Sequence, residues 1–162
     1  RTFARIFNPP LRMLVVGAVH IAQALTKMAA EMGYEVIIID PRDTWGTDDR
    51  FPGVTIDRRW PSTAMADLAP DERTAVVTLC HDPKLDDPAL LVALESQAFY
   101  IGSLGSPRTH ATRVDRLMAA GVSEEIMARI HAPVGLDIGA RTPAEIALSV
   151  IAQVTEALRK VA

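Results

Sequence analysis

The chain has 162 residues, of which 49% are hydrophobic and 23% are charged, and its formal net charge is −3. This length suffices for one domain with a full core, and the interspersed acidic and basic residues argue against a nucleic-acid-binding surface. No apolar run approaches the length of a membrane span, and the first seven residues lack the pattern of a signal peptide. A single cysteine, Cys80, excludes an intrachain disulfide and favours a reducing, cytoplasmic compartment.

The first forty residues contain the pattern on which the fold prediction depends. Residues 13–16 are an apolar run typical of a strand covered on both faces, and Gly17 permits a sharp turn after it. Apolar residues then recur at helical spacing from Ile21 until Gly33 ends the helix. A second buried strand over 36–39 follows, and Asp40 closes it. This order predicts the first half of a dinucleotide-binding βαβ unit.

One position departs from the glycine fingerprint of such units, which is G-x-G-x-x-G/A. Gly17 and Ala22 fit its first and third places, but Val19 stands where the middle glycine is expected. That glycine lets the backbone approach a pyrophosphate closely, and a valine side chain there displaces the phosphate or changes its pose. We therefore predict the fold, with a ligand site that is retained but altered.

The rest of the chain alternates between strand and helix patterns. The predicted strands cover 54–56, 75–79 and 99–101, and an extended segment covers 131–133. The predicted helices are a short one to 68, two over 87–96 and 107–120, a short one to 130 and a last one from 143 to about 161. Pro88 is placed in the first turn of its helix, Ser106 caps another, and Thr142 with Glu145 forms a capping box. The fold class is α/β: one domain over 1–162, with a doubly wound parallel sheet ordered 3-2-1-4-5 in a Rossmann-like three-layer αβα arrangement.

Ligands of such sheets bind at the carboxyl ends of the strands, so the loops there supply the candidate residues. His20 begins the first helix, where it either donates to an anion or faces solvent. Asp40 is predicted to accept from a ribose or similar diol, and Arg42 to pair with a phosphate. The alternative for Asp40 is a capping role in the next turn.

The loop after the fourth predicted strand contains Cys80, His81 and Asp82. A thiol beside an imidazole suggests a nucleophile, but a small buried apolar side chain is the favoured interpretation of Cys80. His81 and Asp82 are the better candidates for lining a cleft. The four histidines show no metal-ligand spacing, so no metal site is predicted.

A glycine-rich turn, 102–106, leads into a helix that carries Arg108 and Arg113, and its amino terminus offers an anion site. The alternative for both arginines is a solvated helix face. Asp137 either serves the cleft or fixes its own turn. The candidate cofactor-binding residues are Gly17, Ala18, Val19, His20, Asp40, Arg42, His81, Asp82, Gly102, Ser103, Gly105, Ser106, Arg108 and Asp137.

Several of these motifs together resemble a known family. They are the segment 15–22, Asp40 with Arg42, residues 81–86, the segment 100–106 and above all the long segment 131–147, HAPVGLDIGARTPAEIA. They are similar to the carboxyl-terminal Rossmann domain of the XdhC/CoxI family. The resemblance covers almost the whole chain, and its longest motif is also its most specific.

The resemblance implies a maturation factor for molybdenum hydroxylases such as xanthine dehydrogenase and carbon monoxide dehydrogenase. Such a protein binds molybdenum cofactor (molybdopterin), protects it while its terminal sulfur is installed, and delivers it to the apo-enzyme. The implied partners are the apo-hydroxylase and a cysteine desulfurase, and the implied state is a cytoplasmic homodimer. The family usually has glycine in place of Val19, and its full-length members carry an amino-terminal domain with a cysteine motif that these 162 residues do not contain.

Three functions follow from the sequence. The favoured one is an accessory protein, rather than a catalyst, that binds and delivers the pterin cofactor or its nucleotide form. The second is an NAD(P)-dependent oxidoreductase, which the fold allows and Val19 disfavours. The third is a nucleotide-binding domain that holds an AMP-like ligand without turnover.

Overall fold

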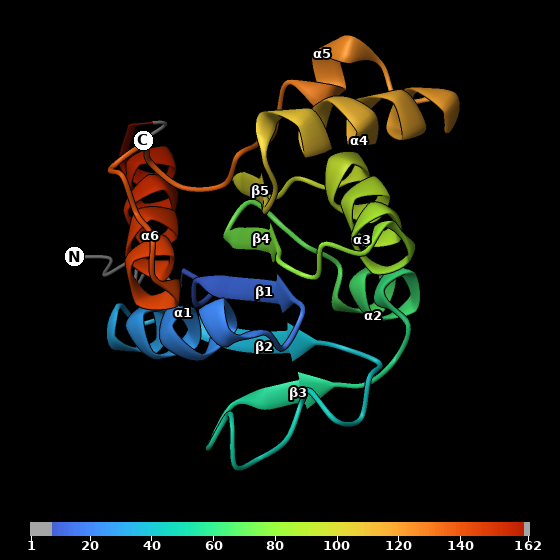
Figure 1. The fold of residues 1–162 in the computed structure, drawn as a ribbon. Helices are drawn as coiled ribbons and strands as arrows, with labels where there is room; N and C mark the ends of the chain where they lie inside the picture. The colour runs from blue at the N-terminus through green and yellow to red at the C-terminus, as the bar shows by residue number, and fades with distance from the viewer. Residues whose placement is uncertain (1–7, 161–162) are drawn as a thin grey trace, which may run out of the picture.

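A parallel sheet of six strands forms the centre of the protein in a computed structural model that describes residues 8–160 (Figure 1). The strands are β1 (Arg12–Val16), β2 (Glu35–Ile39), β3 (Thr55–Asp57), β4 (Thr74–Thr78), β5 (Tyr100–Ser103) and β6 (Ile130–His131). Their order is β3-β2-β1-β4-β5-β6, and every pair is parallel. The register places Val16 beside Ile39 and Thr78, so the three central strands end together at one edge.

Helices cover both faces of this sheet and complete the predicted three layers. They are α1 (His20–Glu31), α2 (Pro61–Leu68), α3 (Pro83–Glu95), α4 (Pro107–Ala119), α5 (Glu124–Met127) and α6 (Pro143–Lys160). Helices α1 and α6 pack together on one face, and α2, α3 and α4 lie on the other (Figure 1). Within residues 8–160, no helix is both long enough and apolar enough to cross a membrane. The predicted end of the last helix near Val161 lies outside the described residues.

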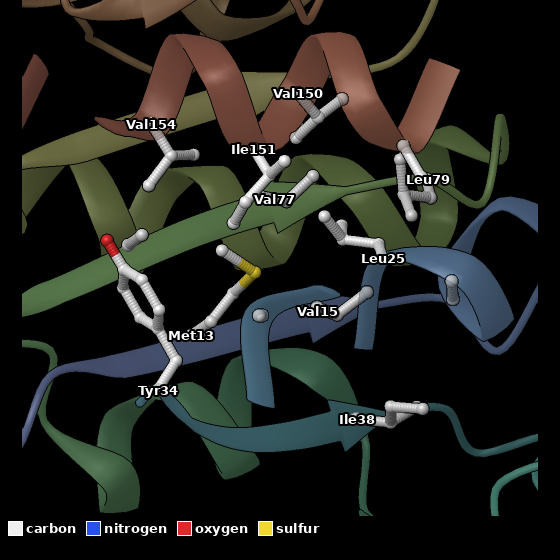
Figure 2. Packing of buried hydrophobic residues seen from close by; sticks show 14 of the residues in the cluster. Met13, Val15, Leu25, Tyr34, Ile38, Val77, Leu79, Val150, Ile151 and Val154 are labelled. Carbon is white, nitrogen blue, oxygen red and sulfur yellow. The ribbon is translucent and has the colours of Figure 1, made fainter. Parts of the chain in front are cut away.

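The core consists of two apolar layers, one on each face of the sheet. Met13 and Val15 of β1 pack towards α1 and α6, beside Leu25 and Val150 (Figure 2). The alternate residues of β1, such as Leu14, face the second layer. Successive strand residues point to opposite faces, so a strand buried on both sides is apolar throughout. This explains the continuous apolar runs and confirms the predicted α/β fold class.

Three details of the sequence prediction were wrong. Ile130 was placed in a helix, but α5 ends at Met127 and Ile130 begins β6, which adds a sixth strand beside β5. The helix predicted from residue 87 begins at Pro83, because the Asp82 carboxylate accepts a hydrogen bond from the backbone N–H of Lys84 at 3.0 Å. Pro88 therefore lies inside α3 rather than in its first turn.

Candidate functional site

Two adjoining hollows lie along the edge where the central strands end. The first, which we call the central cleft, has a volume of about 390 Å³. It is lined by Val19, His20, Ile21, Trp45, Leu79, Cys80, His81, Leu104 and Pro143. The second, the side groove, has a volume of about 520 Å³ and runs along residues 133–140 to Ile146 and Ser149 of α6. Leu104 lines both. Each volume lies within the usual range for a ligand site, roughly 300–1,000 Å³.

The turn after β1 forms one wall of the central cleft. Gly17 has a φ of +111°, and a Cβ on it would lie 2.8 Å from Cys80 Sγ, so both backbone and packing require glycine. Val19 has φ −86° and ψ 176°, an extended conformation open to any residue. The backbone therefore does not need the fingerprint glycine at Val19, whose side chain instead gives the cleft an apolar wall.

The amino terminus of α1 supplies hydrogen-bond donors to the cleft. Its N-cap position is Val19, which makes no side-chain hydrogen bond to the helix. By contrast, α3, α4 and α6 are capped by Asp82, Ser106 and Thr142. The first helical residue, His20, is exposed and lines the cleft. The uncapped N–H groups and the helix dipole favour an anion at this point.

Asp40 holds the first turn from inside the protein. Its side chain is fully buried, and its carboxylate accepts hydrogen bonds from the backbone N–H of Ala18 at 2.8 Å and from the Arg42 guanidinium at 2.7 and 2.9 Å. Burial alone would raise the pKa of Asp40, but the hydrogen bonds from Arg42 and Ala18 outweigh it and lower the pKa. The observed role is therefore the alternative one, which is to fix the local turn, and contact with a diol stays a prediction.

Arg42 connects this carboxylate to the lining of the cleft. Its guanidinium lies 4.7 Å from the centroid of the Trp45 ring, and Nη2 lies 3.8 Å from Cys80 Sγ. Sequence reasoning missed Trp45, although an aromatic residue in the polar loop after the second strand was a usable signal. Contact between Arg42 and a phosphate stays a prediction.

The loop after β4 forms the opposite wall. His81 is exposed, lines the cleft and has a φ of +60°, which is uncommon for a residue with a side chain. Asp82 contributes the cap of α3. Burial, together with Asp86 and Asp40, raises the pKa of the Cys80 thiol far above its usual value. A protonated thiol agrees with the favoured interpretation of Cys80 as a small apolar side chain.

Residues of β5 and its turn contribute packing to the site. Ser103 is fully buried, with its hydroxyl 2.6 Å from that of Thr78, and a Cβ on Gly102 would lie 2.6 Å from Val134 Cγ2. Neither residue lines the cleft or the groove, so their contact with a cofactor stays a prediction. The Ser106 hydroxyl accepts from Thr109 N at 3.1 Å as the cap of α4.

Three further candidates differ in their surroundings. Gly105 is buried with a φ of +146°. Arg108 is exposed and lines neither hollow, so its role stays a prediction. Asp137 is exposed and lines the side groove, in a loop tied to α6 by the hydrogen bond from Gly135 N to Gln153 Oε1 at 2.9 Å.

Two buried charged residues lie below the cleft. Arg113 is only 2% exposed, so the alternative of a solvated helix face was wrong for it. Sequence reasoning did not include Asp86, which is 1% exposed, among the site residues. Both line a cavity of about 20 Å³ between α3 and α4, which we call the α3–α4 cavity. In the described part of the chain, no three His, Cys, Asp or Glu side chains gather closely enough to hold a metal ion.

Comparison with known proteins agrees with this architecture. A protein from Escherichia coli named molybdenum cofactor insertion chaperone PaoD is 37% identical over 91% of this chain and 40% of its own length. A protein from Bacillus subtilis, named as a probable xanthine dehydrogenase subunit, is 29% identical over 99% of this chain and 47% of its own length. The chain thus spans less than half the length of these curated relatives.

Solved structures give the same result for the fold. A crystal structure described as a xanthine dehydrogenase from Bacillus halodurans matches with a TM-score of 0.80 at 27% identity, over 94% of this chain and 44% of that one. The ChuY structure from E. coli matches with a TM-score of 0.52 at 14% identity, over 91% of this chain and 90% of that one, which shows likeness of fold alone. The family model of the XdhC Rossmann domain matches residues 13–154. The chain therefore belongs to the XdhC family, of which it contains the Rossmann domain.

Proposed function

We propose that this domain binds molybdenum cofactor as cargo in the central cleft and takes part in its insertion into a molybdenum hydroxylase. Membership of the XdhC family supports this proposal, as does the 37% identity to a protein named as a cofactor insertion chaperone. The apo-hydroxylase, of the xanthine or carbon monoxide dehydrogenase type, is then the partner that receives the cargo. A cysteine desulfurase partner, a homodimer and a cytoplasmic location stay predictions.

The observation that carries the proposal is the uncapped amino terminus of α1 at the central cleft. A pterin phosphate needs an anion cradle beside a surface for its rings. The N–H groups at His20 offer the cradle, while Trp45 and Leu104 offer apolar ring contacts. The side groove extends this surface past Leu104 towards Asp137, which gives room for a larger, nucleotide form of the cofactor.

The oxidoreductase alternative receives no support from the site. Asp40, which would grip a ribose in a dinucleotide fold, is buried and occupied by Ala18 and Arg42. Val19 stands where the dinucleotide fingerprint has its middle glycine, and its side chain lines the cleft. A bound cargo is therefore favoured over a hydride-transferring cofactor.

The direct test is an anaerobic binding titration of the purified protein with molybdenum cofactor, with NAD, NADP and AMP in parallel. We expect saturable binding of molybdenum cofactor that weakens at least about tenfold in His81→Ala and Trp45→Leu, because both side chains line the cleft. The matched controls are His131→Ala and Trp60→Leu, because neither residue lines the cleft or the groove. Tight NAD(P) binding without cofactor binding would reject the proposal.

A further inference from the structure

The two loops that flank the central cleft are each held from below by a buried charged side chain. One loop contains Cys80 and His81 after β4, and the other contains Leu104 and Gly105 after β5. The buried side chains are Asp86 of α3 and Arg113 of α4, which are 1% and 2% exposed. Both line the α3–α4 cavity, as does His81. The buried charges therefore lie directly beneath the wall of the site.

Asp86 binds the backbone of the first loop. Its Oδ1 accepts from Cys80 N at 3.3 Å, and its Oδ2 accepts from His81 N at 3.0 Å. These bonds hold His81 at a φ of +60°, a left-handed conformation that is strained for a residue with a side chain. Asparagine has one acceptor oxygen and an amide group that only donates, so Asp86→Asn can keep only one of the two bonds.

Arg113 binds the second loop. Its Nη2 donates to the Leu104 carbonyl oxygen at 2.9 Å and lies 3.5 Å from the Cβ that Gly105 would carry as alanine. Its Nε has no hydrogen-bond partner among residues 8–160. A buried cation with an unmatched donor is costly. The Asp86 carboxylate and, to a smaller extent, the Asp87 carboxylate stabilise its charge and raise the pKa of Arg113, although burial outweighs them and lowers it.

We propose that Asp86 and Arg113 are a pair of positioning residues that set the two loops of the central cleft for the cargo. Asp86 fixes the direction of the His81 side chain by holding its backbone in the left-handed region. Arg113 fixes Leu104, the residue shared by the cleft and the side groove. The effect of the two residues on cargo binding rests on the proposed function. Their effect on the conformation of the two loops is testable without any ligand.

The first experiment is a double-mutant cycle of Asp86→Asn and His81→Gly, measured by denaturant unfolding at pH 7. Glycine adopts positive φ without strain, so His81→Gly removes the need for the two hydrogen bonds. We expect Asp86→Asn to lower the folding equilibrium constant about tenfold more in the wild-type background than in the His81→Gly background. The cost of burying a carboxylate is common to both backgrounds and cancels.

Asp87→Asn is the matched control, because Asp87 lines the same cavity but bonds to the Arg116 side chain rather than to the loop. In a double-mutant cycle with His81→Gly, the effect of Asp87→Asn on the folding equilibrium constant should differ by less than about twofold between the two backgrounds. For the second loop, Arg113→Lys should speed amide hydrogen exchange at Leu104 about tenfold, because the Leu104 N–H donates to the Thr78 carbonyl oxygen at 2.9 Å and a lysine lacks the guanidinium that holds the Leu104 carbonyl. Equal cost of Asp86→Asn in both backgrounds, or unchanged exchange in Arg113→Lys, would overturn the positioning roles.

The second experiment is the titration with molybdenum cofactor. Asp86→Asn and Arg113→Lys should each bind about tenfold more weakly, while Asp87→Asn stays within about twofold of wild type. If wild type does not bind, the proposed function fails and the unfolding cycle alone decides whether Asp86 holds the turn. If Asp86→Asn shows coupling but binds like wild type, the role of Asp86 in the site is rejected while the proposed function stands.

Discussion

Replacing Gly17 by alanine tests whether the first turn and the loop after β4 are built as one unit. An added Cβ would lie 2.8 Å from Cys80 Sγ and 3.1 Å from Cys80 N, while the backbone is at a φ of +111°. Both the neighbouring atoms and the conformation oppose a side chain. We therefore expect Gly17→Ala to cost more stability than the same substitution at a positive-φ glycine with open surroundings.

The expected cost has two parts. Adopting positive φ costs an alanine about 1–2 kcal/mol. Crowding against Cys80 adds about 1–3 kcal/mol, as overpacking does in other protein cores. The sum is about 3 kcal/mol, which for a domain of this size corresponds to a fall in melting temperature of roughly 6–12 °C.

Thermal and denaturant unfolding of three single variants and one double variant separates these parts. Gly33→Ala is the matched control, because Gly33 has a φ of +84° and no atom lies within 4 Å of the position that its Cβ would take. It should therefore cost only the conformational part. Cys80→Ala removes Sγ, so Gly17→Ala should cost about 1 kcal/mol less in that background. If Gly17→Ala costs no more than Gly33→Ala, the close contact between the two loops is not present in solution.

Three other predictions concern single groups. Burial raises the pKa of Asp86 from 3.8 to about 6, so the contribution of this carboxyl group to stability is complete below pH 3.8, and about 3 kcal/mol of it is lost as the pH rises through 6. Relative to wild type, Asp86→Asn should therefore gain that amount of stability between pH 4 and 7. Parallel curves of stability against pH for the two proteins would contradict this. Ser106→Ala should cost about 1 kcal/mol through loss of the α4 cap, whereas Thr112→Ala inside that helix should change stability by less than about 0.5 kcal/mol, both measured by denaturant unfolding. Because burial raises its pKa, Cys80 should react with iodoacetamide at about pH 8 at least tenfold more slowly than after unfolding, as followed by mass spectrometry.

The fold was predictable because its signals are local. The apolar run of β1, the turn at Gly17 and the helical spacing of α1 lie within twenty consecutive residues. The strand β6 was missed because two residues give no pattern of their own, and Ile130 pairs with Ile101 of β5 only after the chain has folded. The start of α3 was missed because Pro88 suggested a first turn that Pro83 in fact occupies.

The candidate site was less predictable, because its side chains act across elements. Arg113 lies on a helix whose sequence is mostly polar, so nothing local distinguishes its buried position from the exposed position of Arg108. Asp86 accepts hydrogen bonds from backbone N–H groups five and six residues earlier in the chain. These groups lie in a turn where His81 has a positive φ, which the sequence pattern does not reveal. Sequence patterns show the period of a helix, but they do not show which polar side chain is aimed into the protein.

Asp40 and Val19 together explain why the dinucleotide fingerprint is only partly present. The acidic residue after β2 normally leaves its carboxylate for a ribose, but here Arg42, two residues later, takes it together with Ala18 N. In this structure Arg42 and Ala18 occupy that carboxylate, and Val19 has an extended backbone that does not require glycine. The uncapped N–H groups of α1 are unaffected by either change. The helix amino terminus therefore still offers donors to an anion, and the apolar wall that includes Trp45 is consistent with the proposed cargo, a phosphate joined to a flat ring system.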